Sequence, residues 1–195
     1  MDKISYAIGM NIAANLKQSG VTEVDCQAVA EGLRAVFEGK PTELTAQEAG
    51  QILNKFFVEV EEKLNSRNIE EGAAFLAANG ERAGVVKLPS GLQYEILKAG
   101  NGPKPTAKDK VKCHYHGTLI NGTVFDSSVQ RGEPAVFPVN GVIQGWVEAL
   151  QLMPVGSKWK LFIPSDLAYG ARGAGNSIAP HSTLVFEVEL LEIVK

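Results

Sequence analysis

The stretch VKCHYHGTLINGTVFDSS, residues 111–128, decides the fold of the second half of this chain. It begins with apolar residues at every second position, which is the pattern of a strand with one buried face. Asn121 and Gly122 then tolerate the positive φ angles that a tight primed turn needs, so the pair predicts a β-hairpin. The returning strand carries Phe125, the carboxylate of Asp126 and two serines. Four roles are open to that carboxylate: turn residue, metal ligand, catalytic acid or rim of an apolar pocket.

The same period of two continues on both sides of this stretch. From Val85 onward, apolar residues alternate over residues 92–96, 111–115, 159–163 and 184–190, which predicts strands with buried inner faces. Residues 142–152 have helical spacing instead, and they end before Pro154 and Gly156. One short helix against an antiparallel sheet of four to six strands predicts an α+β domain over residues 85–195.

The first 84 residues have the spacing of helices. Apolar residues recur once per turn over residues 4–16 and 29–37, and each run stops at a glycine. Thr45 and Glu48 are spaced as a capping box, which predicts a long helix over about residues 46–79. Its second part, EEKLNSRNIEEG at residues 61–72, is too polar for a core, so we expect an exposed stalk.

An all-α domain over residues 1–84 would bury little apolar surface by itself. A second copy of the chain could cover its apolar faces, so the sequence predicts a homodimer through residues 1–60. A self-sufficient cap of three helices is the alternative.

Composition and charge exclude several functions. The chain has 195 residues, is 45% hydrophobic and 21% charged, and carries a net charge of −3. This is typical of a globular protein and argues against a nucleic-acid partner. We expect no membrane span. The first residues lack the features of a signal peptide, so the sequence predicts a cytoplasmic location. The periplasm is the alternative if residue 1 is not the native start. Cys26 and Cys113 are expected to be small buried residues outside any disulfide.

Motifs for metal, nucleophile or cofactor chemistry do not occur. His114 and His116 share a strand face, but a zinc site needs three or four ligands, so a solvent-facing pair is favoured. The sequence shows no G-x-S-x-G elbow, P-loop or dinucleotide fingerprint. We expect no metal and no cofactor. The composition of the glycine-rich segment GARGAGN, residues 170–176, favours a mobile loop. A structural role is favoured for His181. For Asp126, one interpretation is an Asx turn that accepts from the amide of Ser128, which is compatible with a functional role.

Aromatic residues gather at the ends and inner faces of the predicted strands and helix. They are Tyr115, Phe125, Phe137, Trp146, Tyr169 and Phe186. A plain core is the ordinary interpretation of such a set. However, the two tyrosines carry polar tips that need partners, and Trp146 follows Gly145 at a helix start, where its ring could floor a concavity.

Three segments together resemble a known family: VKCHYHGTLINGTVFDSS, VIQGWVEALQLMPVGSKWKLFIPSDLAYG and APHSTLVFEVELLEI. They resemble the FKBP-type peptidyl-prolyl cis-trans isomerases, the macrolide-binding family, over about residues 85–195. The N-terminal helices with a long connecting helix resemble the Mip-like and bacterial FklB-like branch, whose members are V-shaped homodimers. The resemblance implies a half-wrapped antiparallel sheet around a short helix, with a hydrophobic pocket for proline between them.

The resemblance also implies roles for individual residues. Trp146 would be the pocket floor, and the substrate-binding walls would be Tyr115, Phe125, Phe137, Val142, Ile143 and Phe186. Asp126 would sit at the rim beside Arg131, and Ile178 would close the side formed by the loop. The hydroxyl of Tyr169 and the backbone amide of Ile143 would each donate to a carbonyl of the substrate. Three positions depart from the family pattern and predict a thinner outer wall: Ala135, Ala174 and Gly141.

The implied activity is rotation of X-Pro bonds in unfolded or nascent polypeptides. Amide rotation costs about 18–20 kcal/mol because it breaks resonance, but it breaks no covalent bond and requires no nucleophile or metal. Two alternatives remain open. The domain could be a module that binds proline or a macrolide, with incidental isomerase activity, or the helical half could be a chaperone-like cradle for unfolded chains.

Overall fold

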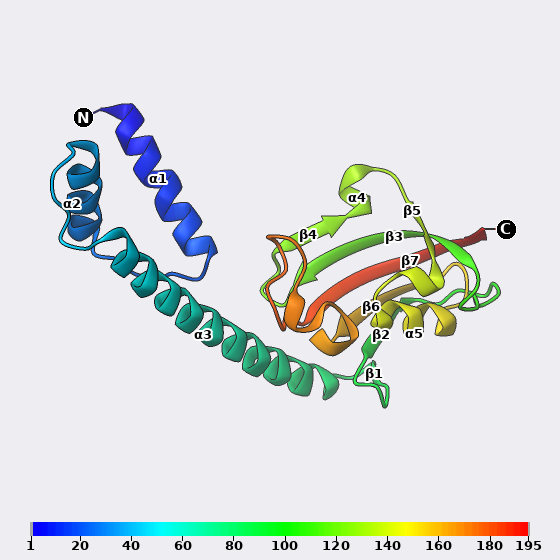
Figure 1. Ribbon diagram of the computed structural model, residues 1–195. Helices are drawn as coiled ribbons and strands as arrows, with labels where there is room; N and C mark the ends of the chain where they lie inside the picture. The colour runs from blue at the N-terminus through cyan, green and yellow to red at the C-terminus, as the bar shows by residue number, and fades with distance from the viewer. Residues whose placement is uncertain (1, 195) are drawn as a thin grey trace. The chain divides into compact units, whose positions relative to one another are not determined.

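The computed structural model describes residues 2–194 (Figure 1). The chain divides into two compact units, and the division falls between Leu64 and Asn65, inside the longest helix. The expected boundary lay before Val85. It differs because the second part of this helix packs with the sheet and belongs to the second unit.

The first unit consists of α1 (Lys3–Gln18), α2 (Cys26–Phe37) and the first part of α3 (Ala46–Gly80). The side chains of Asp2 and Asp25 cap the first two helices by accepting backbone N–H groups. The expected capping box opens α3: the Thr45 amide donates to Glu48 Oε2 at 2.8 Å, and the Glu48 amide donates to Thr45 Oγ1 at 3.2 Å. Local capping therefore defines where all three helices start.

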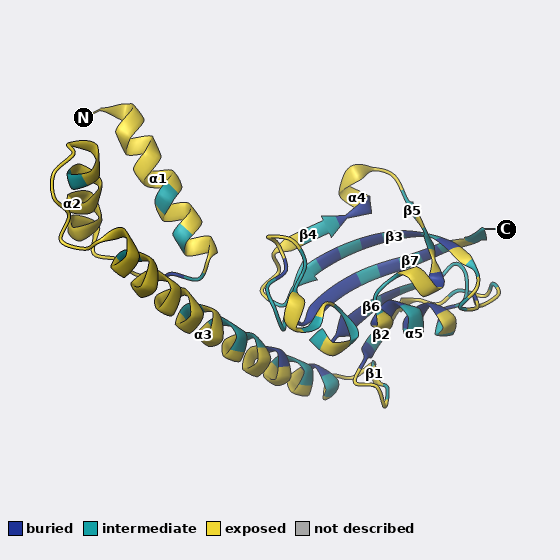
Figure 2. Cartoon of the chain, viewed as in Figure 1, coloured by how far each residue is buried: buried dark blue, intermediate teal, exposed yellow. Residues whose placement is uncertain are grey.

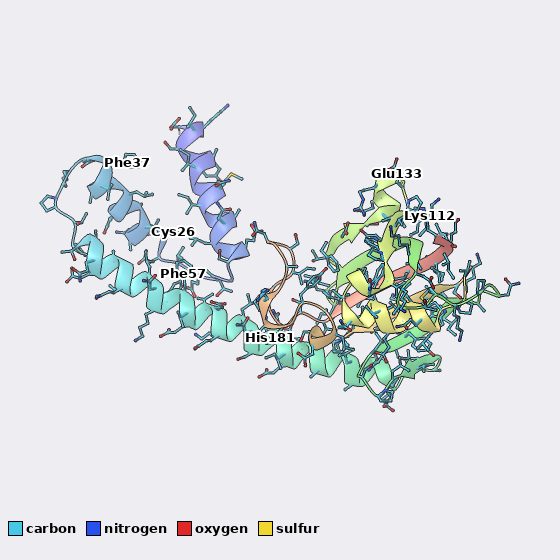
Figure 3. The ribbon with its side chains drawn as sticks, turned by 45° about the vertical axis from the view of Figure 1, so that its right-hand side comes forward. Cys26, Phe37, Phe57, Lys112, Glu133 and His181 are labelled. Atoms are coloured by element: carbon cyan, nitrogen blue, oxygen red, sulfur yellow. The ribbon has the colours of Figure 1, made fainter. Side chains whose placement is uncertain are left out.

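The first unit has almost no interior. Val21 is the only buried residue among residues 2–64 (Figure 2). Large apolar side chains are instead exposed along all three helices and the segments that join them, and two of them, Phe37 and Phe57, are labelled in Figure 3. They are Ile4, Tyr6, Ile8, Met10, Val24, Val29, Leu33, Val36, Phe37, Leu44, Ile52, Leu53, Phe56, Phe57 and Val58. Cys26 is exposed as well, so the expectation that both cysteines are buried is wrong for this one.

The second unit is built on a seven-stranded antiparallel sheet with the order β1-β2-β6-β7-β3-β4, and β5 also pairs with β3. The strands are β1 (Val85–Lys87), β2 (Gln93–Lys98), β3 (Lys110–Leu119), β4 (Val124–Ser127), β5 (Ala135–Pro138), β6 (Lys158–Ile163) and β7 (Leu184–Val194). Four to six strands were expected. The count is higher because the short helix α4 (Ser128–Arg131) breaks one edge strand into β4 and β5.

The core lies between the sheet and α5 (Gln144–Leu152), and the predicted α+β fold class is confirmed (Figure 1). The alternation predicted for β7 is observed, because Leu184, Phe186, Val188 and Leu190 are all buried. In β2, Ile96 is an exception to the predicted alternation at 49% exposure, although it pairs with the buried Trp159. Three single-turn 3₁₀ helices complete the unit: η1 (Val139–Gly141), η2 (Ser165–Leu167) and η3 (Gly170–Arg172).

The second part of α3 covers the opposite face of the sheet. The rings of Phe75 and Phe162 lie 6.0 Å apart, and Phe162 alternates with the core residues of β6. Asn79 donates to Gln93 Oε1 at 2.8 Å, and Gln93 Nε2 donates to the carbonyl of Leu76 at 2.8 Å. The expectation of an exposed stalk holds for most of residues 61–72, eight of which are exposed. It is corrected at Gly72, which is buried, and Asn65 and Asn68 are half-buried.

The predicted hairpin forms, but its turn is of another kind. Gly122 has a φ of +85°, whereas Asn121 does not have a positive φ. The amide of Leu119 donates to Thr123 O at 2.9 Å, and that of Gly122 donates to Leu119 O at 3.0 Å. This is the three-residue hairpin loop that ends with a glycine in the left-handed region, not the two-residue primed turn.

Candidate active site

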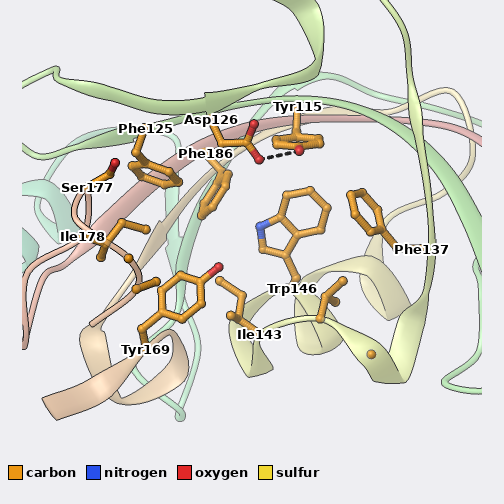
Figure 4. A pocket seen from close by; sticks show the side chains of 14 residues that line it. Tyr115, Phe125, Asp126, Phe137, Ile143, Trp146, Tyr169, Ser177, Ile178 and Phe186 are labelled. Carbon is orange, nitrogen blue, oxygen red and sulfur yellow. Dashed lines mark hydrogen bonds between the residues drawn. The ribbon is translucent and has the colours of Figure 1, made fainter. Parts of the chain in front are cut away.

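A cavity of about 690 Å³ opens between the sheet, the start of α5 and the segment that precedes β7 (Figure 4). Its lining is mainly aromatic and aliphatic, with one carboxylate. The residues are Tyr115, Phe125, Asp126, Phe137, Gly141, Val142, Ile143, Trp146, Tyr169, Ala174, Gly175, Ser177, Ile178 and Phe186.

Trp146 lies in the first turn of α5 and is 4% exposed. Three rings meet its indole edge to face: Tyr115 at 5.5 Å and 82°, Phe137 at 5.8 Å and 83°, and Phe186 at 5.3 Å and 82°. These are favourable aromatic geometries. The indole Nε1 is buried and has no hydrogen-bond partner within residues 2–194. The floor of the cavity is thus a rigid ring cluster with one unused donor.

A β-bulge places Phe125 and Asp126 on the same wall. Gly117 pairs with Asp126 while Thr118 pairs with Val124, so Phe125 is the extra residue of β4. Phe125 packs edge to face on Phe186 at 5.4 Å. A Cβ at Gly117 would lie 2.7 Å from a ring atom of each phenylalanine, so only glycine leaves room for both rings.

Asp126 belongs to a three-residue network at the rim. The Tyr115 hydroxyl donates to Asp126 Oδ2 at 2.6 Å, and Arg131 Nη2 donates to the Tyr115 oxygen at 2.7 Å. Arg131 also forms an ion pair with Asp126 and lies over the Tyr115 ring. The expected Asx turn from Asp126 to Ser128 does not form; Ser127 is the cap, and it accepts from the amide of Gln130 at 3.2 Å.

The electrostatics of this network favour a charged carboxylate and a protonated phenol. Burial acts to raise the pKa of Asp126, but the hydrogen bonds from Tyr115 and Arg131 outweigh it and hold that pKa below the ordinary value. Burial and the bond to Asp126 raise the pKa of Tyr115. The bond to Asp126 also raises the pKa of Arg131. At neutral pH the phenol is therefore a hydrogen-bond donor to a carboxylate.

Two hydrogen-bond donors of cavity-lining residues outside the Asp126 network have no protein partner within the described residues. The Tyr169 side chain is 39% exposed, and its hydroxyl points into the cavity on the side of Ile143 (Figure 4). The backbone amide of Ile143 precedes α5 and donates to no other protein group. Both are free to meet a ligand.

Ten of the eleven residues expected at the site line this cavity. Arg131 is the exception, and it contacts Asp126 and Tyr115 from outside the lining. Of the three departures, Ala174 and Gly141 line the cavity, whereas Ala135 pairs with Cys113 in the sheet. Gly175 and Ser177 were missed. The only signal was the glycine-rich segment 170–176, which contains Gly175 and ends just before Ser177; it predicted a loop but not that the loop faces the cavity.

The remaining candidates take structural positions. His114 Nδ1 lies 3.1 Å from Ser128 Oγ and His116 Nδ1 lies 2.9 Å from Ser127 Oγ, so both rings are half-buried against hydroxyls and not fully solvent-facing as expected. His181 has a φ of +58°, and its amide donates to Gly170 O at 2.8 Å. Within residues 2–194 no group of three or more His, Cys, Asp or Glu side chains is placed to hold a metal ion.

Comparison with known proteins agrees with this geometry. The family model "FKBP-type peptidyl-prolyl cis-trans isomerase" matches residues 102–191. The model "Domain amino terminal to FKBP-type peptidyl-prolyl isomerase" matches residues 1–96. The chain is 48% identical to the FKBP-type 22 kDa peptidyl-prolyl cis-trans isomerase of Escherichia coli (strain K12) over 197 residues, which covers 97% of this chain and 94% of that protein.

Two further proteins match nearly the whole chain. The outer membrane protein MIP of Legionella longbeachae is 44% identical, with 100% of this chain and 86% of that protein covered. The crystal structure of FkpA from Escherichia coli superimposes with a TM-score of 0.73 at 36% identity, and the match covers 98% of this chain and 95% of that chain.

The chain belongs to the FKBP-type peptidyl-prolyl cis-trans isomerases. Within that family it falls with the FkpA- and MIP-type members, and it carries the amino-terminal domain in addition to the isomerase domain. It is therefore a peptidyl-prolyl cis-trans isomerase. Within residues 2–194, no helix has both the length and the apolar character that crossing a membrane requires.

Proposed function

We propose that the cavity above Trp146 binds the proline of a polypeptide substrate and that the preceding amide bond rotates there. The observation that carries this proposal is a ring-lined hollow edged by two donors, the Tyr169 hydroxyl and the Ile143 amide, that have no protein partner within residues 2–194. A pyrrolidine ring is compact and apolar, and an aromatic floor with an open mouth suits it.

The physical basis is a difference between two environments. A planar amide is dipolar and well hydrated, whereas a twisted amide loses much of its charge separation. Transfer from water into an aromatic pocket therefore disfavours the planar ground state relative to the transition state. Each tenfold of rate requires about 1.4 kcal/mol, so a few such contributions are enough to matter.

Donors at the edge of the cavity would hold the substrate while the bond turns. The Tyr169 hydroxyl and the Ile143 amide have no protein partner within residues 2–194, and we assign them to substrate carbonyls. The indole Nε1 of Trp146 is a third unused donor, on the cavity floor. Fixing the carbonyls at these positions would leave the prolyl nitrogen as the part that moves.

In this proposal Asp126 acts mainly by position. Its bond from Tyr115 and its ion pair with Arg131 keep the wall of the pocket in place. Its charge near the twisting carbonyl is a secondary influence, because the carboxylate is itself paired with a cation.

The proposal is tested with two tryptophans of equal burial. Trp146 and Trp159 are each 4% exposed, but only Trp146 lines the cavity, while Trp159 stacks on Tyr94 at 4.2 Å. We expect Trp146→Leu to lower kcat/KM for an X-Pro peptide at least tenfold. Trp159→Leu should lower the free energy of unfolding but leave kcat/KM within about threefold. Equal kcat/KM values for the two variants would contradict a role of the cavity in the reaction.

A binding module with incidental activity is the second candidate. Ala174 and Gly141 leave the outer wall without large side chains, which favours loose proline or macrolide binding over tight closure. The chain should then bind a proline peptide well but accelerate the refolding of a proline-limited protein only weakly. Refolding kinetics with and without the chain separate the two possibilities.

We further propose that the chain is a homodimer through residues 1–60. The fifteen large apolar side chains exposed in this unit support it, because a monomer would leave them in water. Light scattering should give twice the mass of one chain. Phe37→Glu, at a side chain that is 87% exposed, should lower that mass, whereas Gln51→Glu, an exposed polar position on α3, should not. A wild-type chain that scatters as a monomer would contradict the dimer.

For partners and compartment we propose unfolded or nascent polypeptides that contain proline, in the cytoplasm. The exposed free thiol of Cys26 supports a reducing compartment. Cell fractionation tests the location, and recovery of the chain in the periplasm would favour the alternative.

A further inference from the structure

One wall of the cavity is an irregular segment, residues 169–183, which we call the pocket loop. Five of its residues line the cavity: Tyr169, Ala174, Gly175, Ser177 and Ile178. The loop is folded on itself by bonds between the backbones of Ala174 and Ile178, at 2.8 and 3.1 Å. It also contains Gly170, Gly173 and Gly175, all with positive φ. Such a segment has many accessible conformations unless something outside it fixes its position.

The long helix provides that fixed point. Asn68 Nδ2 donates to the carbonyl of Pro180 at 2.8 Å, across 112 positions of sequence, and Asn68 is half-buried. Among the hydrogen bonds of residues 2–194, this is the only one that ties the pocket loop to a residue outside it. Figure 3 shows His181, the next residue, where the loop runs beside α3.

A second contact lies one helical turn further along the same face of α3. Gly72 is buried, and a Cβ built on it would collide with Oγ1 of Thr183, the last residue of the pocket loop. Residues four apart share a face of a helix, so Asn68 and Gly72 act on the loop together. Thr183 leads directly into β7, which carries Phe186 into the cavity.

We infer that α3 sets the position of the pocket loop, and that Asn68 and Gly72 are positioning residues for the proline pocket. Neither residue touches the cavity. A loop held in place before substrate arrives loses less conformational freedom on binding, so the anchor should act mainly on KM. The inference rests on the proposed proline pocket for its kinetic consequence, but not for its effect on the loop itself.

The first test removes the donor of Asn68 in the full chain. Asn68→Asp keeps the shape and replaces the N–H donors by oxygens that repel the Pro180 carbonyl. Ser66→Asp adds the same charge at an exposed position two residues away and is the matched control. Amide exchange of Ala174 and Ile178 should become about two- to tenfold faster in Asn68→Asp, as expected for one lost hydrogen bond. KM should rise about threefold or more with kcat nearly unchanged, and Ser66→Asp should match the wild type in both.

The second test is a double-mutant cycle on the close contact. Gly72→Ala should displace Thr183 and raise KM, because the new methyl group meets the Thr183 hydroxyl. In a Thr183→Ala background the hydroxyl is gone, and the same Gly72→Ala change should have little further effect. Equal effects of Gly72→Ala in both backgrounds would contradict a positioning role through Thr183.

The two readouts separate this inference from the pocket proposal. If the loop amides of Asn68→Asp exchange at the wild-type rate and its KM is unchanged, the inference that α3 positions the pocket loop is contradicted, even when Trp146→Leu is inactive. If amide exchange becomes faster while KM stays constant and Trp146→Leu remains active, α3 positions the loop but the cavity is not the proline site. A loss of thermal stability without either change would leave α3 as a purely structural cover, which also overturns the inference.

Discussion

The hydroxyl of Tyr115 donates to Asp126 Oδ2 across 2.6 Å, and it does so because a β-bulge turns Asp126 to the inner side of the sheet. Asp126 pairs with Gly117, which is two residues from Tyr115 and therefore on the same face of β3. The bulged residue, Phe125, lines the cavity too. Two consecutive residues of β4 thus serve one wall, which a regular strand would not allow.

Replacement of Asp126 by alanine should lower kcat/KM for an X-Pro peptide about tenfold, equivalent to about 1.4 kcal/mol. The reason is the loss of the partner that fixes both Tyr115 and Arg131. A protease-coupled assay measures the rate, and circular dichroism should show an intact fold. Glu133→Ala, at an exposed acid two residues after Arg131 that does not line the cavity, is the control and should keep the wild-type rate. An unchanged rate for Asp126→Ala would place the carboxylate outside the site.

Tyr169→Phe isolates one hydroxyl. That oxygen has no protein partner within residues 2–194, so its removal should not change the free energy of unfolding. If it donates to the substrate, kcat/KM should fall about fivefold, which is the contribution of one hydrogen bond of about 1 kcal/mol. The same peptide assay and a urea titration provide both numbers. A variant with full activity would leave Tyr169 as a wall residue only.

Phe186→Ala should reduce both stability and activity. Phe186 is 5% exposed, packs on Trp146 and Phe125, and lines the cavity. We expect the free energy of unfolding to fall by about 3–5 kcal/mol. Leu190→Ala, on the same strand but away from the cavity, should also destabilise and yet keep most of the activity of its folded fraction. Phe186→Leu serves where the alanine variant does not fold, and it should still lower kcat/KM.

The lowered pKa of Asp126 predicts how the contribution of its carboxylate to kcat/KM depends on pH. A carboxyl group whose pKa is lower in the folded state contributes stability above its ordinary pKa of about 3.9, and loses it as pH falls through the folded value. The ratio of wild-type to Asp126→Asn kcat/KM should therefore be constant from about pH 5 to 9. Exchange spectroscopy on an X-Pro peptide measures it without a protease. A change in this ratio centred inside that range would contradict the assignment.

The two cysteines should differ in reactivity. Burial raises the pKa of the Cys113 thiol to about 12, whereas Cys26 is exposed. Because the thiolate is the reactive form, a thiol reagent at pH 8 should label Cys26 in the native chain and Cys113 only after unfolding. The variant Cys26→Ser should then show no rapidly reacting thiol. Rapid labelling of that variant would mean that the sheet opens readily around β3.

Residue pattern was sufficient for the elements and for much of the pocket. Strand alternation identified the inner faces of β3, β6 and β7, and glycine and capping signals located the helices, because these depend on local geometry. Ten pocket residues were named from a family resemblance that rests on local motifs. Two expectations were wrong: the turn at Gly122 belongs to a three-residue loop, and Cys26 is exposed in a unit with almost no interior.

By itself, the sequence determined which segments are helix or strand and which residues are able to form an apolar site, because side-chain period and chemical type are properties of the chain. Only the tertiary structure decided that a bulge turns Asp126 and Phe125 the same way, that Arg131 does not line the cavity, and that Asn68 meets Pro180. These relationships depend on a bulge, a short helix and a contact across 112 residues, and such long-range packing leaves no periodic trace in the sequence.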